Sequence, residues 1–333
     1  MNKLFICGGR QRTTVIRKLE EWQSCECAVI VELNPDKGES RVCVEYVSPP
    51  DAVPEELPSF LFKSGTLKDN KLYTCTSTEV LIYELPTFRL ENCISLPCFN
   101  DLHHVYPSRR GTLLVVVTGL DMVVEITTSG TVVREWSVLG ENIWARFSRE
   151  TDYRKVATTK PHHSHPNHTF ELGQEVWVTR LQQRDAICLT TPGPRIDIAV
   201  QRPHDGYLFQ DKIYFTTVDG HIVIANQKTM QVEQMIDLNQ MSNRSDQVLG
   251  WCRGVLPLDE RWLWVGFTRV RPTKFVENVS WIRHGRRHKS THIALYDLKR
   301  HTCEREIELE PLGVGVVFSL LSTLPESTKA ESS

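Results

Sequence analysis

The sequence has no long hydrophobic run and no excess of charge of either sign. None of its apolar runs approaches the roughly 20 residues that a membrane-spanning helix requires, and the apolar stretch within residues 1–10 is too short for a secretory signal. The 39 Lys and Arg residues nearly balance the 41 Asp and Glu residues, so the formal net charge is −2 and no global basic field attracts nucleic acid. We therefore expect a cytoplasmic protein without a membrane or nucleic-acid partner.

Helical patterns and the common catalytic motifs are also missing. Apolar residues at a 3.6-residue period are nearly absent, and the only short helices that we expect lie at residues 14–23 and 141–154. The sequence contains no phosphate-binding glycine loop, no nucleophile elbow and no paired-histidine zinc helix. Most of the 10 cysteines lie in apolar strand segments, where a cytosolic protein keeps them as small buried hydrophobic residues.

Short strands separated by turns are abundant, and they repeat. Five copies of a unit of three short apolar strands run along the chain, and the equivalent positions in these copies are Leu72, Leu114, Val176, Ile213 and Leu263. Successive positions are 42, 62, 37 and 50 residues apart. A period of about 40 residues with three or four strands per repeat is typical of a β-propeller.

A sixth blade is expected to be shared between the two ends of the chain. Residues 28–33 and 42–47 supply two strands, and residues 315–321 complete the sheet. Pairing both ends removes the open sheet edge that would invite aggregation. The sequence thus predicts an all-β, single-domain propeller over residues 1–324 and a disordered tail over residues 325–333. It has about six blades, five or seven being the alternatives.

Histidines gather where three successive blades begin, in residues 102–105, 161–168 and 202–206. The leading residues of the inner strands meet at one mouth of a propeller channel, and neutral imidazoles that converge there suit Zn, Fe or Cu. His162 and His163 are expected to be exposed on an inserted loop. The predicted metal ligands are His104, His165, His168 and His204.

Two further residues complete the predicted site. Asp205 would accept a hydrogen bond from a metal-binding imidazole and fix its tautomer, and Arg253, which opens the next blade, would orient an anionic substrate. The sequence therefore favours a metal-dependent or histidine-dependent enzyme that acts on a small molecule at the channel mouth. Lyase, hydrolase and oxidoreductase chemistry all remain open.

Two other interpretations remain open. Histidines at blade openings also hydrogen-bond the backbone of a neighbouring blade and so staple the ring, and a channel mouth can bind a ligand without any metal. The propeller can instead be a non-catalytic interaction module. In that case the insertions at residues 139–160 and 271–290 would bind a protein partner.

The blade over residues 103–136 carries a series of motifs. It begins with His103-His104-Val105-Tyr106-Pro107, continues through the glycine-led strand at 111–115 and the Met-Val-Val-Glu-Ile strand at 122–126, and ends on a tryptophan at 136. This series resembles a blade of the arylsulfotransferase-type propellers, and the His-Pro-Asn at 165–167 is similar to the His-x-Asn that opens another blade of that family. The resemblance implies a six-bladed propeller with channel histidines, one of which carries the sulfuryl group in the family's enzymes. Sulfuryl transfer is therefore a further interpretation.

Overall fold

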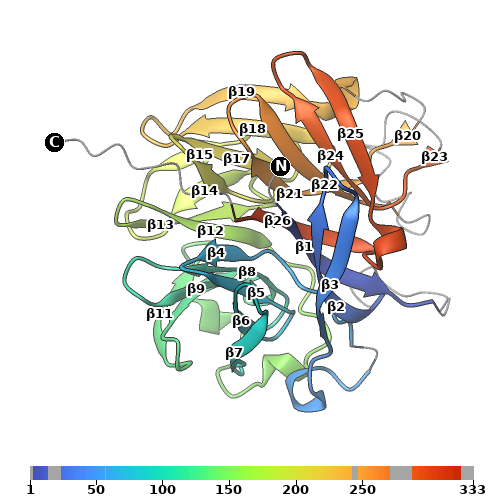
Figure 1. Ribbon diagram of the computed structural model, residues 1–333. Helices are drawn as coiled ribbons and strands as arrows, with labels where there is room; N and C mark the ends of the chain where they lie inside the picture. The colour runs from blue at the N-terminus through green and yellow to red at the C-terminus, as the bar shows by residue number, and fades with distance from the viewer. Residues whose placement is uncertain (1–2, 14–23, 57, 242–246, 271–286, 324–333) are drawn as a thin grey trace.

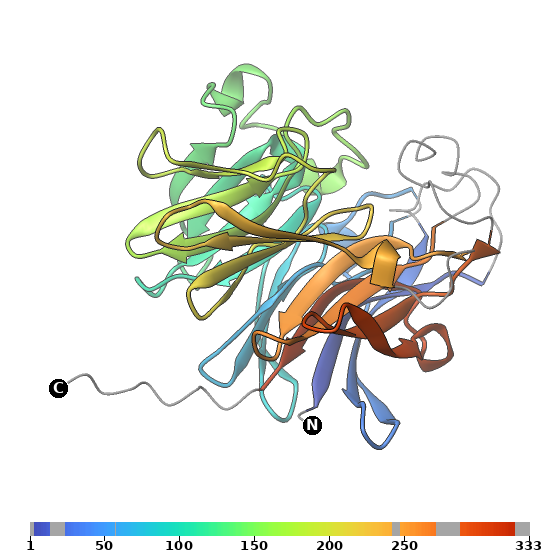
Figure 2. The same cartoon turned by 90° about the horizontal axis from the view of Figure 1, so that it is seen from above.

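The computed structural model describes residues 3–13, 24–56, 58–241, 247–270 and 287–323. These residues form six four-stranded antiparallel sheets arranged as the blades of a propeller (Figures 1 and 2). From the inner to the outer strand, the first three blades are β26 (Val316–Ser322), β1 (Leu4–Gln11), β2 (Cys25–Asn34) and β3 (Glu39–Tyr46); β4 (Thr66–Lys68), β5 (Lys71–Cys75), β6 (Val80–Glu84) and β7 (Arg89–Ile94); and β8 (Leu102–Pro107), β9 (Leu113–Val117), β10 (Met122–Ile126) and β11 (Val132–Ser137). The other three are β12 (Pro166–Leu172), β13 (Glu175–Arg180), β14 (Asp185–Cys188) and β15 (Arg195–Asp197); β16 (Tyr207–Phe209), β17 (Lys212–Thr216), β18 (His221–Asn226) and β19 (Val232–Asp237); and β21 (Trp251–Pro257), β22 (Trp262–Thr268), β24 (His292–Asp297) and β25 (Thr302–Glu308).

Only short elements lie outside the blades in the part of the chain that the structure describes. They are a two-stranded ladder and six 3-10 turns, namely β20 (Gln247–Val248) and β23 (Arg287–His288), with η2 (Pro50–Ala52), η3 (Thr118–Leu120), η4 (Ile143–Ala145), η5 (Tyr153–Lys155), η6 (Leu238–Met241) and η8 (Glu310–Leu312). No helix among the described residues is long and apolar enough to cross a membrane.

The two ends of the chain meet in one blade, as the sequence predicts. The last strand, β26, pairs with β1 so that Leu4 lies opposite Ser322 and Phe5 lies opposite Leu321. β1 then pairs with β2, and β2 with β3. The ring of six blades is therefore closed by hydrogen bonds between the two ends of the chain (Figure 1).

The middle strands of a blade are buried on both faces because a neighbouring blade packs against each face. Every residue of β9 and β10 is buried, which explains why all of them except Glu125 are apolar. Outer strands such as β11 are mostly exposed. The three-strand repeat in the sequence corresponds to the second, third and fourth strands of each blade. The inner strand β26 of the shared blade is predicted, whereas the inner strands of the other five blades are missed by the repeat; two of these, β4 and β16, are only three residues long.

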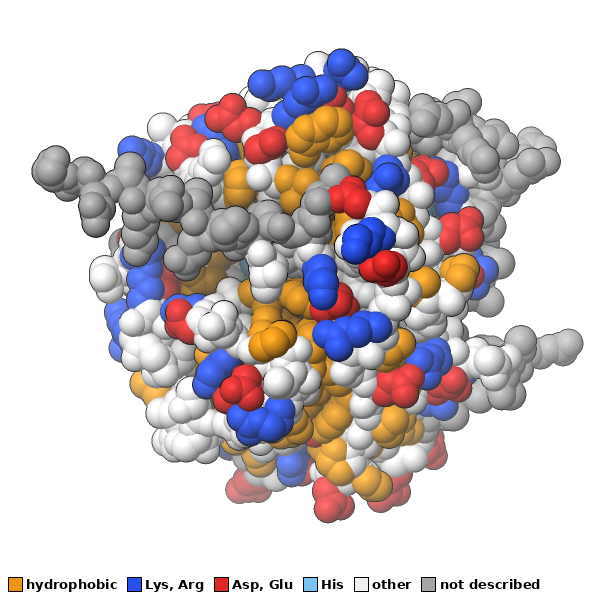
Figure 3. Space-filling model, viewed as in Figure 1, with side chains coloured by type: hydrophobic (Ala, Val, Ile, Leu, Met, Phe, Trp, Pro, Cys, Tyr) orange, Lys and Arg blue, Asp and Glu red, His pale blue; other side chains and the backbone are white. Residues whose placement is uncertain are grey.

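The outer surface has mixed charge. On the face shown in Figure 3, basic and acidic side chains are interspersed and do not gather into an area of one sign. Several charged side chains of the protein form ion pairs within a blade, such as Lys3 with Glu32 and Arg89 with Glu84. This distribution agrees with the small net charge of the sequence.

The insertion at residues 139–160 folds against the start of the β8 blade. It contains the turns η4 and η5 in place of the helix expected at 141–154. Asn100, just before β8, donates hydrogen bonds of 2.8 Å to the carbonyl oxygens of both Tyr153 and Val156. The insertion is thereby attached to the same end of the blade from which the first histidines arise.

The insertions near residues 239–249 and 271–290 contact each other, because β20 pairs in parallel with β23. Residues 271–286, the helix expected at 14–23 and the tail expected at 325–333 lie outside the described residues.

Candidate active site

Two pockets are lined by the inner strands and by the segments that precede them. The first, the polar pocket, has a cavity volume of about 80 Å³. It is lined by Leu61, Lys63, Asp101, His103, Lys160, His165, Arg253, Val316 and Phe318. The second, the aromatic pocket, has a cavity volume of about 240 Å³. It is lined by Gly65, Thr66, Leu67, His104, Tyr106, His168, Phe170, Gly206, Tyr207, Leu208, Leu321 and Ser322.

The two pockets lie at different levels of the same strands. On β26, Phe318 lines the polar pocket and Leu321 lines the aromatic pocket. On β12, His168 lines the aromatic pocket, whereas His165, just before the strand, lines the polar pocket. The polar pocket therefore collects residues that precede or open the inner strands.

His103 is buried in the polar pocket near two other histidines. Its ring centroid lies 4.9 Å from that of His165 and 6.1 Å from that of His204. Its Nδ1 atom lies 2.9 Å from the backbone carbonyl oxygen of Asp101. A carbonyl oxygen can only accept a hydrogen bond, so Nδ1 carries the proton of the neutral ring. Nε2 is therefore the nitrogen with a lone pair.

Two cationic side chains lie over the ring of Phe318. Lys63 Nζ is 4.7 Å from the ring centroid, and Arg253 Cζ is 4.4 Å from it. The buried Lys63 also forms an ion pair of 3.1 Å with Asp101 Oδ1. Lys160 is a third cation in the lining. Three cations and one carboxylate give the polar pocket a positive balance, which favours an anionic ligand.

Asp121 fixes the backbone of the histidine-rich loop before β12. Its buried carboxylate accepts hydrogen bonds from the backbone N–H groups of His163, Ser164 and His165, at 2.9, 3.0 and 2.9 Å. The same carboxylate pairs with Arg146 at 3.1 Å. His165 adopts a positive φ of 56°, a conformation that a non-glycine residue keeps only where its surroundings hold it.

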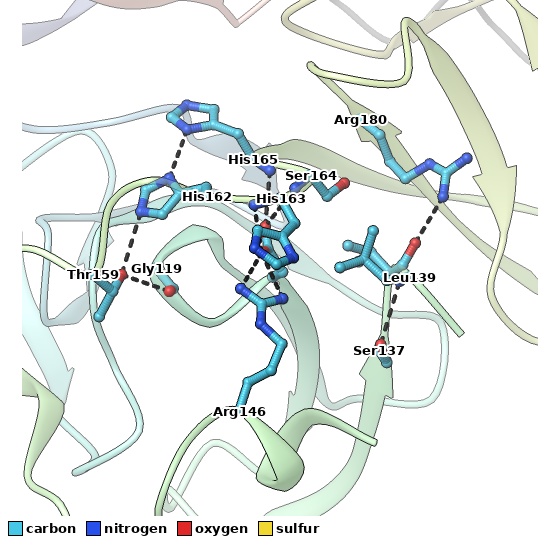
Figure 4. Close-up of polar contacts among 12 residues, drawn as sticks. Gly119, Ser137, Leu139, Arg146, Thr159, His162, His163, Ser164, His165 and Arg180 are labelled. Atoms are coloured by element: carbon cyan, nitrogen blue, oxygen red, sulfur yellow. Dashed lines mark hydrogen bonds and ion pairs between the residues drawn. The ribbon is translucent and has the colours of Figure 1, made fainter. Parts of the chain in front are cut away.

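A chain of hydrogen bonds sets the tautomers of His162 and His165. Thr159 Oγ1 donates to the carbonyl oxygen of Gly119 at 2.6 Å, so it accepts from His162 Nε2 at 3.3 Å. A neutral His162 then has its lone pair on Nδ1, which lies 2.8 Å from His165 Nδ1. His165 donates to it and keeps a lone pair on Nε2. Figure 4 shows His162 between Thr159 and His165.

Burial keeps the histidines of both pockets neutral. Desolvation, with nearby Lys63, lowers the pKa of His103 to about 3, and desolvation alone lowers the pKa of His168 to about 3. Desolvation also lowers the pKa of His165 well below its usual value. Burial on its own would raise the pKa of Asp101, but Lys63 holds it well below its usual range. At neutral pH the polar pocket therefore presents neutral imidazoles beside a carboxylate.

His104, although it follows His103 directly, belongs to the aromatic pocket. The Thr169 N–H donates to its Nδ1 at 3.2 Å, so its Nε2 carries the proton and donates to Thr66 Oγ1 at 3.1 Å. Its ring stacks on that of His168 with a centroid distance of 3.6 Å. Both ring nitrogens are thus used to join β4, β8 and β12 of three successive blades. In this arrangement His104 staples the blades, and metal binding by it stays a prediction.

Asp205 also joins blades. Its carboxylate accepts from Thr216 Oγ1 and, at 3.0 Å, from the Gly254 N–H, and its carbonyl oxygen accepts from Thr179 Oγ1 at 2.8 Å. None of the hydrogen bonds that it makes within the described residues goes to an imidazole, so the predicted role in fixing a histidine tautomer is not what its contacts provide. Burial raises the pKa of Asp205 to about 6.

The four predicted metal ligands do not meet at one point. His165 and His204 lie near His103, whereas His104 and His168 stack on each other in the aromatic pocket. Successive residues of a strand point to opposite faces, so counting residues back from a strand does not show which histidine reaches which pocket. Arg253 lines the polar pocket, and its role in orienting an anion stays a prediction.

Several residues of the polar pocket were not predicted from the sequence. Lys63 and Asp101 precede short inner strands and belong to no motif. His162 was expected to be exposed but is buried, while His163 is exposed as expected. Among the described residues, one group of three potential metal ligands has donor atoms within 4.8 Å of one another, and it consists of Asp101, His162 and His165.

No protein-family model matches the chain, and no curated protein matches it in sequence. Solved structures do resemble it. A protein of unknown function from Bacteroides caccae aligns over 96% of this chain and 98% of its own, with a TM-score of 0.62 and 12% identity. A streptogramin B lyase aligns over 92% of this chain and 88% of its own, with a TM-score of 0.49 and 12% identity. A catalytically inactive virginiamycin B lyase from Staphylococcus aureus, solved with quinupristin, aligns over 71% and 69%, with a TM-score of 0.44 and 13% identity.

At these identities the likeness establishes the fold alone, and that fold is a β-propeller. It supports the propeller part of the arylsulfotransferase-type resemblance. The chemistry has to be argued from the pockets.

Proposed function

We propose that the polar pocket is the active site of an enzyme that acts on a small anionic substrate, with His103 as the proton acceptor. The observation that carries this proposal is the placement of a histidine with a lone pair on Nε2 in a pocket that also presents Lys63 and Arg253. A general base must be neutral and must have its proton-accepting nitrogen available. His103 meets both conditions.

The cations would hold the anionic group of the substrate. Arg253 and Lys63 both lie over the ring of Phe318, at 4.4 and 4.7 Å from its centroid. A carboxylate, sulfate or phosphate accepts charge-assisted hydrogen bonds from such groups. A cavity of about 80 Å³ has room for one group of this size together with a few water molecules.

A bound anion would also make His103 a stronger base. The nearby cations and burial disfavour the protonated imidazole. An anion between them offsets the positive charge, while the Asp101 carbonyl oxygen continues to accept from Nδ1 and stabilises the imidazolium that forms. Proton removal would thus be favoured only when substrate is present, which suits elimination or hydrolysis.

Binding of inorganic sulfate tests the anion site. We expect sulfate to perturb the NMR signals of isotope-labelled His103 and to bind about tenfold more weakly to Arg253→Met, a change of about 1.4 kcal/mol. Arg110→Met, which removes an exposed arginine elsewhere on the surface, is the matched control. Equal sulfate affinity in the two variants would refute the anion site.

Turnover tests the catalytic role of His103. A panel of small sulfate, phosphate and carboxylate compounds should yield at least one substrate, and His103→Gln should lower kcat by a factor of roughly 10² to 10⁴, which is the usual contribution of a general base. Undiminished turnover in His103→Gln would remove His103 from the mechanism while leaving the anion site in place.

Sulfuryl transfer is a second candidate, because the sulfuryl group is anionic and the same lone pair can act as a nucleophile. His103 Nε2 would attack the sulfur of an aryl sulfate, the bond from sulfur to the aryl oxygen would break, and the phenolate would leave. Intact-mass measurement after exposure to an aryl sulfate should then show one added sulfuryl group in the protein and none in His103→Gln. No mass gain in the unsubstituted protein would exclude this candidate.

A further inference from the structure

We infer that Asp101, His162 and His165 form a binding site for one divalent first-row metal ion, with zinc as the best fit. The donor atoms of these three side chains lie within 4.8 Å of one another. Two imidazoles and one carboxylate are a donor set that binds Zn²⁺ or Fe²⁺ and leaves positions for water or substrate. The inference concerns the same pocket as the proposed function but rests on different atoms.

The orientation of His162 is that of a metal ligand. Its Nε2 donates to Thr159 Oγ1, which is itself held by the Gly119 carbonyl oxygen. Metal-binding histidines usually anchor their second nitrogen in this way. The lone pair on Nδ1 consequently points toward His165 and is available to a cation.

His165 supplies the second nitrogen. Its Nδ1 lies 2.8 Å from His162 Nδ1, whereas two nitrogens bound to one zinc ion at 2.0–2.1 Å lie roughly 3.0–3.4 Å apart. A shift of a few tenths of an ångström therefore converts the hydrogen-bonded pair into a ligand pair. The metal would take the place of the shared proton between the two Nδ1 atoms, and that proton would move to His165 Nε2, so both imidazoles would bind in their neutral forms.

The loop that carries both histidines is built to hold this arrangement. Three consecutive backbone N–H groups are bound by Asp121, and His165 is kept at a positive φ. His162 is buried, although it follows an exposed segment. Rigid positioning of ligands before the ion arrives lowers the entropy cost of binding.

The positive charge of Lys63 disfavours metal binding at this site. Its Nζ lies 3.1 Å from Asp101 Oδ1, so it competes with a cation for that carboxylate and repels it. This opposition makes a distinctive prediction, because removal of the lysine charge should strengthen metal binding while it weakens anion binding. A purely structural role for the three side chains does not predict a gain of any kind.

The test uses the full chain after removal of metal with EDTA. Titration with Co²⁺ should show one bound equivalent, ligand-field absorption without a thiolate charge-transfer band, and displacement by Zn²⁺. We expect His162→Gln and His165→Gln to weaken binding at least tenfold and Lys63→Met to strengthen it several-fold. His163→Gln, on the same loop but exposed, should leave the affinity unchanged.

Three results would overturn the inference: no binding at one equivalent, a thiolate band that shows cysteine ligation, or equal losses in His163→Gln and His162→Gln. If the histidine variants do not fold, Lys63→Met decides, since unchanged or weaker binding contradicts the site. The anion site is judged separately, because Arg253→Met should lose sulfate binding and retain the metal. His162→Gln should lose metal binding and retain sulfate binding.

Discussion

His103 and His104 are neighbours on β8, yet they differ in what their ring nitrogens can do. In the polar pocket, His103 donates a hydrogen bond from Nδ1 to the Asp101 carbonyl oxygen and keeps a lone pair on Nε2. In the aromatic pocket, His104 Nδ1 accepts a hydrogen bond from the Thr169 N–H, and His104 Nε2 donates one to Thr66 Oγ1. The hydrogen-bond partners of a channel histidine, rather than its presence in the channel, decide whether it is available for chemistry.

The two pockets also differ in charge and in size. The polar pocket contains three cations and a carboxylate in about 80 Å³. The aromatic pocket has about 240 Å³ and no charged residue in its lining. The larger cavity is thus the less suited to proton transfer, because a reacting group needs partners whose charge changes its affinity for a proton.

The largest effect that we expect is loss of stability in acid, to which both pockets contribute. The pKa of His103 and that of His168 are both lowered to about 3, and those of His104, His165 and His204 are lowered well below the usual value, in each case first by burial. Below pH 6.5 the unfolded chain binds protons at these residues and the folded chain does not. The free energy of unfolding must therefore fall as pH falls from about 6.5 toward 3.

His103 and His168, whose pKa values are lowered to about 3, each contribute up to about 1.4 kcal/mol per pH unit, and the other three histidines act in the same direction. We therefore expect the free energy of unfolding to fall by at least about 4 kcal/mol between pH 6.5 and 5, as followed by urea denaturation at a series of pH values. Bound sulfate should favour protonation of His103 in the polar pocket and so reduce the slope of the free energy of unfolding against pH. It should have no such effect in Arg253→Met. A free energy of unfolding that stays constant from pH 7 to 5 would contradict the neutral state of these side chains.

The second largest effect should come from Asp121, and it should disturb the polar pocket alone. Asp121→Ala leaves three backbone N–H groups and the partly buried Arg146 without their shared acceptor. We expect a loss of about 3–5 kcal/mol in the free energy of unfolding. Urea denaturation measures that loss, and histidine NMR should show the His162–His165 hydrogen bond broken.

Asp259→Ala provides a matched control for Asp121→Ala. Asp259 also accepts from two backbone N–H groups, those of Arg261 and Trp262, but it is exposed, so water can replace it and the loss should be much smaller. The signals of His104 and His168 should be unchanged in both variants. Equal losses of stability would mean that burial of the Asp121 carboxylate is unimportant.

The fold could be predicted from the sequence more fully than the site. The strands that repeat are apolar because neighbouring blades bury them, so the repeat period can be read from equivalent residues such as Leu114 and Val176. The closure by both ends can be read from the apolar strands at residues 28–33, 42–47 and 315–321. The site depends largely on segments that precede the inner strands, where Lys63, Asp101 and His165 lie, and these segments have no repeating apolar pattern. A register irregularity between Leu102 and His104 separates the two neighbouring histidines in a way that no periodic pattern encodes.

The charged partners of the site could not be predicted for a related reason. Lys63 and Asp101 are 38 residues apart in the chain and come together only because adjacent blades open at the same mouth. The backbone of the loop that follows His162 is held by the carboxylate of Asp121, which lies in the preceding blade. Convergence of this kind follows from the closed ring, and local sequence contains no trace of it.

The sharpest comparison replaces each of the two neighbours on β8 by alanine. His104→Ala removes a fully buried ring that bonds two other blades and leaves both a cavity and unpaired groups, so we expect a loss of about 2–4 kcal/mol in the free energy of unfolding. His103→Ala removes one hydrogen bond to a carbonyl oxygen beside a polar pocket that water can fill, and should cost about 1 kcal/mol. Denaturation measures both, and each variant is the control for the other. If His103→Ala proved the more destabilising, His103 would be the staple, and its lone pair would no longer distinguish the polar pocket as the place where chemistry occurs.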